Sequence, residues 1–377
     1  MKNLDISSGG SLYSVLTLME YLEKKGYKLK IIVNKRKEKE IPVKYEVIPI
    51  NASLGDFNRH LALRKIIKKE KPDFVFSNIL TQNITLSLAK GIFRKKVETK
   101  CIGIVRDASS FKQNKGLLKL LNRIWVKIIY ENLDCIIAVS KAVKKDLIKA
   151  FFIKKDKIKV IYNPFDLKKI RELSKEDIQP EHREIFEKYK VIINVGRINY
   201  QKRHDLLLKV FKKVKENIKD VKLVIIGMCG TKEDEKNKEN LKKLIKKLNI
   251  EDDVYFLGFQ KNPFKYIKRS KVFVLTSEHE GLPRVVIESL AVGIPVFAFK
   301  SEYVDTTEIF PEDYFTLAPF PDTNQLAQKI VKTLKDKNLY EKLQKDTHKF
   351  AEKFSADKSV NHYINLMENL KQKNKCD

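Results

Sequence analysis

The stretch Ser277-Glu278-His279-Glu280-Gly281-Leu282-Pro283-Arg284-Val285-Val286-Ile287-Glu288 decides the fold of this chain. Two short apolar runs bracket it, Val272–Leu275 and Val296–Phe299, the second preceded by Gly293-Ile294-Pro295. This order predicts a strand, a loop, a helix and a second strand. The Gly-Leu-Pro turn offers backbone N–H groups at the helix start, where phosphate is attracted. Glu280 and Glu288 flank the turn and can accept hydrogen bonds from hydroxyls. The loop therefore suits a ligand with both phosphates and hydroxyls, such as a sugar nucleotide.

The same alternation of strand and helix extends through most of the chain. It predicts an α/β fold with parallel sheets, whose ligands bind at the carboxyl ends of the strands. The expected strands are Leu29–Val33, Tyr45–Ile50, Phe74–Ser77, Cys101–Val105, Cys135–Val139, Lys159–Tyr162, Val191–Val195, Leu223–Ile226, Val254–Leu257, Val272–Leu275 and Val296–Phe299. The expected helices of the second half are Asn240–Leu248, Thr323–Lys335, Tyr340–Phe354 and Ser355–Gln372.

The length of 377 residues allows two domains. A turn at Asn163-Pro164-Phe165-Asp166, followed by a charged segment without a strand at Leu167–Lys190, predicts the boundary. We expect a first domain over residues 1–165 and a second over residues 166–354. A glycine-rich turn in such a domain should follow a strand, yet only Leu4 and Ile6 are apolar before Gly9. The first strand is therefore expected to be missing or very short, as if the frame began at an internal methionine.

The composition excludes several classes of protein. The apolar content of 43% excludes disorder, and no apolar run reaches the ~18 residues of a membrane-spanning helix. The four cysteines show no close pairing, and Met1–Gly10 is too polar for a secretory signal, so a cytoplasmic location is expected. The net charge of +29 would attract nucleic acid, anionic lipid or phosphorylated substrates, and it also fits a general lysine bias on solvated helix faces. The scattered lysines lack the aromatic interleaving of nucleic-acid-binding motifs, so no nucleic-acid partner is expected.

Two cations stand at the end of another expected strand. Gly196-Arg197-Ile198-Asn199-Tyr200-Gln201-Lys202 directly follows Val191–Val195. An arginine fork and a lysine point charge match phosphate oxygens, and together they can stabilise a departing diphosphate without a metal. The alternative is an exposed pair in a lysine-rich chain. Combined with the paired glutamates in the same half, the cations favour a diphosphate-sugar site.

These motifs resemble those of the family-4 retaining glycosyltransferases. The resemblance lies in Gly196-Arg197…Lys202, Gly227 and the segment from Glu280 to Val296, with weaker matches at Ser8-Gly9-Gly10 and between Ile136 and Asp166. It implies the GT-B architecture, in which two Rossmann-like domains face each other across a cleft. The segment 355–377 would be a helix that returns to the first domain. No cofactor and no metal would be required.

The resemblance also implies roles for individual residues. Arg197 and Lys202 would hold the donor diphosphate, Glu280 would contact the donor sugar and assist catalysis, and Glu288 would bind the ribose hydroxyls. Phe259, after Gly258, would lie against the base. The donor would also contact the backbone of Gly10, Gly227 and the loop of Gly281, Leu282 and Pro283. Pro283 lacks an N–H, so it cannot donate there.

The first domain departs from the family pattern. Many members carry a histidine at a strand end facing the donor sugar, whereas here Cys101–Val105 ends in Arg106-Asp107. Asp107 could accept a proton from the acceptor hydroxyl, and Arg106 could bind an acceptor phosphate. Alternatively, the two residues form a salt bridge that caps the strand. Of the nearby histidines in the second domain, His279 is expected to be a bystander and His204 a surface or capping residue.

One helix of the first domain could contact a membrane. Phe111–Tyr130 contains five basic residues, no acid and the only tryptophan of the chain. At ~100° per residue, its lysines and arginine form one arc, and the opposite arc is apolar. The apolar residues of that arc are Leu117, Leu118, Leu121, Ile124, Trp125, Ile128 and Ile129. Such a helix suits an anionic membrane surface, or it is an ordinary helix that buries its apolar face against the sheet.

The leading hypothesis is a retaining glycosyltransferase. It would move a hexose or N-acetylhexosamine from a nucleotide-diphosphate sugar, UDP- rather than GDP-linked, to a glycan or lipid-linked acceptor. The expected setting is bacterial surface-polysaccharide synthesis, such as capsule or lipopolysaccharide, with the enzyme cytoplasmic or peripheral on the inner face of the plasma membrane. A GT-B sugar-nucleotide epimerase and a catalytically inactive relative are the alternatives.

Overall fold

The computed structural model describes residues 10–33, 44–50, 58–92, 95–107, 116–300 and 306–372. They divide into two compact units. The first contains the chain up to Phe165 together with the segment from Ala356 onward, and the second runs from Asp166 to Ser355. The expectation of a missing first strand concerns residues 1–9, which lie outside the described residues; Gly10 opens a helix.

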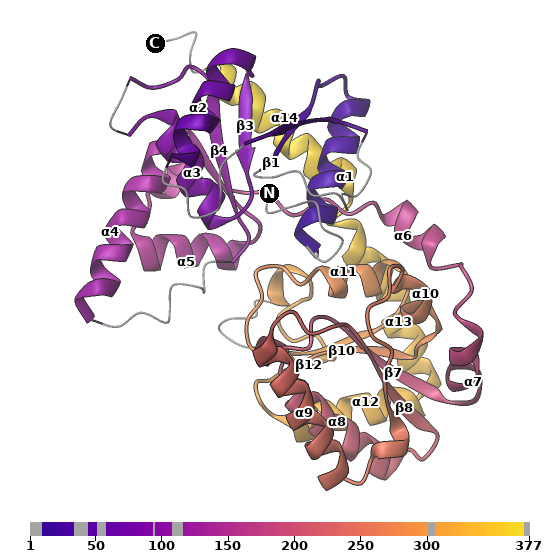
Figure 1. The fold of residues 1–377 in the computed structure, drawn as a ribbon. Helices are drawn as coiled ribbons and strands as arrows, with labels where there is room; N and C mark the ends of the chain where they lie inside the picture. The colour runs from indigo at the N-terminus through magenta and orange to yellow at the C-terminus, as the bar shows by residue number, and fades with distance from the viewer. Residues whose placement is uncertain are drawn as a thin grey trace. The chain divides into compact units, whose positions relative to one another are not determined.

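Parallel strands form both sheets of the first unit (Figure 1). Its strands are β1 (Lys30–Val33), β2 (Glu46–Pro49), β3 (Phe74–Ser77), β4 (Lys100–Val105), β5 (Cys135–Ala138) and β6 (Ile158–Val160). In the described residues β1 pairs with β2, and β3 to β6 form a second sheet in chain order. Its helices are α1 (Gly10–Lys24), α2 (Arg59–Glu70), α3 (Leu80–Lys90), α4 (Gly116–Asn132), α5 (Lys141–Phe151) and α14 (Ala356–Gln372).

The last helix of the chain packs on the first unit. Figure 1 shows α14 in yellow beside α1 and β3, and the rings of Phe76 and Tyr363 lie 6.1 Å apart. Tyr363 is 1% exposed, and the backbone N–H of Ala356 donates to the carbonyl of Phe165. Burial of an aromatic side chain of this size stabilises the contact strongly. This is the location that the family resemblance implies for α14.

The second unit is one six-stranded parallel sheet in the order β12-β11-β10-β7-β8-β9. The strands are β7 (Lys190–Val195), β8 (Val221–Ile226), β9 (Val254–Phe256), β10 (Val272–Leu275), β11 (Val296–Lys300) and β12 (Leu317–Pro319). The helices are α6 (Leu167–Leu173), α7 (Pro180–Lys188), α8 (His204–Asn217), α9 (Lys232–Lys247), α10 (Phe264–Arg269), α11 (Arg284–Ala291), α12 (Thr323–Lys335) and α13 (Lys337–Glu352). The core strands β7, β8 and β10 are mostly apolar and almost fully buried, as strands covered by helices on both faces must be.

Several predicted elements differ from those observed. The helix expected at Asn240–Leu248 begins earlier, at Lys232, because the Thr231 side chain caps it. The helix expected at Tyr340–Phe354 spans Lys337–Glu352, with Asp336 as its cap. The segment Leu167–Lys190 holds two helices, and β12 was not expected at all.

The sheet order of the second unit fixes where a ligand can bind. Starting from β7, the chain adds β8 and β9 on one side and β10, β11 and β12 on the other. The sheet order therefore reverses between β7 and β10, and folds of this kind bind ligands at the carboxyl ends of the strands at such a point. We call this edge, with the loops that follow the two strands, the β7/β10 crevice. Both motifs singled out in the sequence stand in these two loops.

Candidate donor-binding site

Two loops of the second unit are joined by four hydrogen bonds at the β7/β10 crevice. The N–H of Glu278 donates to the carbonyl of Gln201 at 2.9 Å, and Gln201 Nε2 donates to the carbonyl of His279 at 2.8 Å. Thr276 Oγ1 donates to the carbonyl of Lys202 at 2.9 Å. Finally, Lys202 Nζ lies 2.6 Å from Glu280 Oε1. These bonds hold the two loops to each other.

The Lys202–Glu280 pair is partly shielded from solvent. The two side chains are 17% and 12% exposed, so their attraction is screened less than that of a surface pair. Lys202 ends a short 3-10 helix, Tyr200–Lys202, which the Asn199 side chain caps by accepting from the N–H of Lys202. Arg197, at the start of the same loop, is exposed. An ammonium and a guanidinium on one short loop can both reach a diphosphate.

Glycines let the strand ends approach closely. A Cβ on Gly227, which follows β8, would lie 1.8 Å from the carbonyl oxygen of Gly196, which follows β7. A Cβ on Gly196 would lie 3.3 Å from Lys202 Cε, so the lysine stem runs over the bare backbone of Gly196. The N–H of Gly227 in turn donates to the carbonyl of Gly258 after β9. Gly227 needs glycine because a backbone carbonyl occupies the space of a side chain there.

The second glutamate of the motif lies on α11. Glu288 Oε1 accepts from Arg284 Nη2 at 3.0 Å, and the two side chains are 13% and 16% exposed. The helix begins after Pro283, and no side chain caps its first turn. Leu282 and Pro283 are buried, so their side chains anchor the loop and only their backbone can face a ligand. Glu280 and Glu288 are therefore both mostly buried, and each is paired with a cation.

Apolar side chains are exposed beside the polar loops. Met228 and Phe259 follow the adjacent strands β8 and β9 and are 45% and 48% exposed. A planar base can stack on exposed side chains of this kind. The second unit thus carries the following predicted donor residues at the carboxyl edge of one sheet: Arg197, Lys202, Gly227, Phe259, Glu280, Gly281, Leu282, Pro283 and Glu288.

His204 was expected to be a surface or capping residue, and both alternatives are wrong, because it is buried and Arg203 holds the cap position of α8. His204 is 1% exposed, and its Nε2 lies 3.1 Å from Asn194 Oδ1. Asn194 Nδ2 donates to the carbonyl of Val274, which ties β7 to β10 next to the crevice. Burial, together with the charge of Lys202, lowers the pKa of His204 to about 4, so the imidazole is neutral. Asn194, Gln201 and Thr276 also link the two strand ends, and no pattern in the sequence marks these three residues.

The predicted acceptor residues lie in the first unit, after β4. Arg106 Nη2 donates to Asn78 Oδ1 at 3.0 Å, and Nη1 contacts Asn163 Oδ1. Asn78 follows β3 and Asn163 follows β6, so three strand ends converge on this guanidinium. Asp107 is exposed. Gly10 is the first residue of α1.

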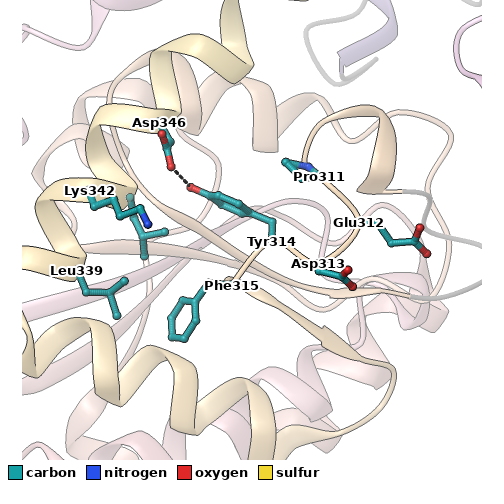
Figure 2. A pocket seen from close by; sticks show the side chains of 9 residues that line it. Pro311, Glu312, Asp313, Tyr314, Phe315, Leu339, Lys342 and Asp346 are labelled. Atoms are coloured by element: carbon teal, nitrogen blue, oxygen red, sulfur yellow. Dashed lines mark hydrogen bonds between the residues drawn. The ribbon is translucent and has the colours of Figure 1, made fainter.

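A cavity of about 450 Å³ lies elsewhere in the second unit (Figure 2). It is formed by Pro311–Phe315 and by the first half of α13, and Tyr314 OH donates to Asp346 Oδ2 at 3.0 Å. Because β12 is parallel to β11, the segment just before β12 lies at the amino ends of the strands. The cavity is therefore at the edge opposite Lys202 and Glu280, and none of the predicted site residues lines it.

The fold is that of an α/β protein with two Rossmann-like units. Residues 175–353 match the family model of the glycosyl transferases group 1, and residues 8–169 match that of Glycosyltransferase Family 4. The chain belongs to the family-4 glycosyltransferases, and it is an enzyme of this class with the GT-B fold.

Two relatives illustrate the match in sequence. A Campylobacter jejuni protein is 30% identical over 89% of both chains; it is named N-acetylgalactosamine-N,N'-diacetylbacillosaminyl-diphospho-undecaprenol 4-alpha-N-acetylgalactosaminyltransferase. An uncharacterised glycosyltransferase of Methanocaldococcus jannaschii is 36% identical over 64% of this chain, and the match spans 58% of that protein.

Solved structures show the same fold at low sequence identity. Anabaena HepE in complex with UDP-glucose has a TM-score of 0.78 at 17% identity and matches over 98% of each chain. A glycosyltransferase of Rickettsia africae has a TM-score of 0.77 at 19% identity and matches over 96% of this chain and 95% of the other.

Proposed function

We propose that the protein is a retaining glycosyltransferase that moves a hexose or N-acetylhexosamine from a UDP-sugar to a glycan or lipid-linked acceptor. The observation that carries the proposal is the Lys202–Glu280 contact at the β7/β10 crevice. It sets a cation for the diphosphate next to a carboxylate for the sugar. The name of the Campylobacter jejuni relative supports a lipid-linked acceptor, and the Anabaena complex supports a UDP donor.

In this proposal, each candidate residue of the second unit contacts a different part of the donor. Arg197 and Lys202 neutralise the diphosphate as its bond to the sugar breaks, in a setting where preorganised charge stabilises the transition state. Glu280 orients the sugar, Glu288 accepts from the ribose hydroxyls, and Phe259 contacts the base. The acceptor hydroxyl attacks from the side that the diphosphate leaves, and the departing oxygen takes its proton. The two cations replace a metal ion in this scheme.

In the first unit we propose that Asp107 and Arg106 serve the acceptor. Asp107 is exposed and could accept a hydrogen bond from the acceptor hydroxyl before the proton passes to the departing oxygen, while the Arg106 guanidinium has its orientation set by Asn78 and Asn163. Gly10 would allow the backbone at the start of α1 to approach the donor.

We place the enzyme at the cytoplasmic face of the membrane, in the synthesis of a surface polysaccharide. Among the described residues, no helix is long and apolar enough to cross a bilayer.

The test is transfer from a panel of radiolabelled UDP- and GDP-sugars to lipid extracts and soluble glycans, with and without EDTA. We expect an acid-labile glycolipid product with a UDP-sugar, a product anomer that matches the donor, and equal rates with EDTA. Product of inverted configuration, or a rate abolished by EDTA and restored by Mn²⁺, would contradict the mechanism. Conversion of the sugar nucleotide without any acceptor would identify an epimerase instead.

A further inference from the structure

Helix α4 packs on the first unit with only part of its apolar surface. Val126, Ile129 and Tyr130 are 2% exposed or less. Ser87 Oγ donates to the carbonyl of Ile129 at 2.7 Å, and Asn132 Nδ2 donates to the carbonyl of Ser87 at 2.8 Å. These contacts attach α4 to α3. Val126, Ile129, Tyr130 and Asn132 therefore attach α4 to the first unit, and the other described apolar residues of the arc take no part in this attachment.

The remaining apolar residues of α4 form an exposed stripe. Leu121, Ile124, Trp125 and Ile128 are 52%, 49%, 39% and 43% exposed. Their spacing of three, four and seven residues places them on one side of the helix. Of the two alternatives for this arc, burial against the sheet does not hold for these four residues. Single exposed apolar side chains are normal, but a contiguous stripe marks an interaction surface.

Basic residues border the stripe. At ~100° per residue, Arg123 and Lys127 fall between the stripe and the buried face. Both side chains are half-buried, so their stems cover the helix and their charges reach its edge. The sequence from 111 to 130 contains no acidic residue, and the whole chain carries +29. An apolar stripe with a cationic border is complementary to anionic lipid, and tryptophan favours the membrane interface.

We propose that Leu121, Ile124, Trp125 and Ile128 insert into the surface of an anionic membrane, with Arg123 and Lys127 against the lipid headgroups. The helix lies in the plane of the interface. Membrane binding can be measured without donor or acceptor, so this proposal can be tested separately from the proposed glycosyl transfer. It would bring the enzyme to the layer in which a lipid-linked acceptor resides.

Trp125 reports directly on this surface, because it is the only tryptophan of the chain. We expect its emission to shift to shorter wavelength, and its quenching by iodide to fall, with vesicles of equal phosphatidylglycerol and phosphatidylcholine at low salt. Vesicles of phosphatidylcholine alone should give a much weaker response. Unchanged emission with anionic vesicles would overturn the proposal. A blue shift that grows with protein concentration without lipid would assign the stripe to a second copy of the chain.

Substitutions can distinguish membrane binding by the α4 stripe from nonspecific binding of the protein to vesicles. Ile124→Ser combined with Ile128→Ser should weaken vesicle partitioning by at least about tenfold, since two half-exposed aliphatic side chains no longer insert. Arg123→Gln combined with Lys127→Gln should weaken it by roughly tenfold at low salt and less at high salt. Tyr13→Ser removes an equally exposed side chain from α1 and should leave partitioning unchanged. An equal loss in all three variants would contradict the assignment to α4. Melting temperatures should match the parent, because no substituted side chain is in the core.

Discussion

Lys202 Nζ lies 2.6 Å from Glu280 Oε1, although 78 positions of sequence separate the two residues. The contact joins the loop after β7 to the loop after β10 at the point where the sheet order reverses. If Lys202 binds the diphosphate as proposed, the diphosphate arrives beside a carboxylate that this contact holds in place. Preorganisation of this kind lowers the cost of ordering the site on binding.

Substitution of either partner should separate the two roles. Lys202→Met should weaken UDP binding and lower transfer at least about a hundredfold, because the leaving diphosphate loses a preorganised cation. Glu280→Gln should leave UDP affinity near normal and still impair transfer, because the sugar alone loses its partner. Titration with UDP and UDP-sugars, alongside product formation, distinguishes these outcomes. Lys209→Ala, an exposed change on α8, is the control.

The same pair makes a prediction for stability. Each single variant should lose about 1–3 kcal/mol of unfolding free energy, because one half-buried charge is left without its partner. The double variant Lys202→Met with Glu280→Gln should recover most of this loss and remain inactive. Denaturant unfolding provides the measurement. Recovery of transfer in the double variant would show that the pair is only structural.

Gly227 should not tolerate a side chain. Gly227→Ala forces the new Cβ against the carbonyl of Gly196, so the ends of β7 and β8 must separate, at a cost of about 1–3 kcal/mol or more. UDP affinity should fall with it. Gly230→Ala is the matched control, because a Cβ there would lie 3.4 Å from Asp234 Oδ2, an ordinary contact. Equal melting temperatures for the two variants would refute the steric account.

Gln201 should act as a positioning residue for Glu280. Gln201→Ala removes the bond to the carbonyl of His279 and loosens the loop that carries the glutamate. We expect kcat to fall roughly tenfold, since small misplacements of reacting groups are costly, with little change in UDP affinity. Gln328→Ala, an exposed substitution on α12, controls for the loss of an amide. A change confined to UDP affinity would be inconsistent with this role.

His204 should make stability depend on pH. Its pKa falls from 6.5 to about 4 on folding, so between these values the unfolded chain binds a proton that the folded chain does not. The free energy of unfolding therefore decreases as pH drops through this window, by up to about 3 kcal/mol. His204→Gln keeps a group that can donate to Asn194 and should show a flatter profile. Parallel profiles for parent and variant, measured by denaturant unfolding from pH 7 to pH 4, would disprove the linkage.

Much of the fold followed from local patterns, and the exceptions have physical causes. Buried strands such as Val272–Leu275 are continuous apolar runs, so they are visible in the sequence. By contrast, β12 is three residues long, ends in proline and is a strand only because it pairs with β11. The start of α9 has no apolar residue, so hydrophobic periodicity missed it. The Thr231 cap, with acids in the first turn, was the available signal.

The sequence indicated which residue types the two candidate loops carry, but it did not indicate which of these residues contact each other. The glycines, cations and glutamates mark the loops, because these residue types suit a ligand that carries both phosphates and hydroxyls. The links made by Gln201 and Thr276 depend on which strands are neighbours, which no local pattern contains. His204 stands among charged neighbours and is buried only because Asn194 lies opposite it. Periodicity located α4 but could not say which side of it packs.

The position of α14 has a consequence for synthesis of the protein. The first unit contains both ends of the described chain, and the second is one continuous segment between them. The second unit is thus built like a domain inserted into another. A ribosome releases all of it before Tyr363 can fill its place beside Phe76. Removal of α14 should therefore leave the second unit able to fold, while the first unit exposes core side chains that Tyr363 covers.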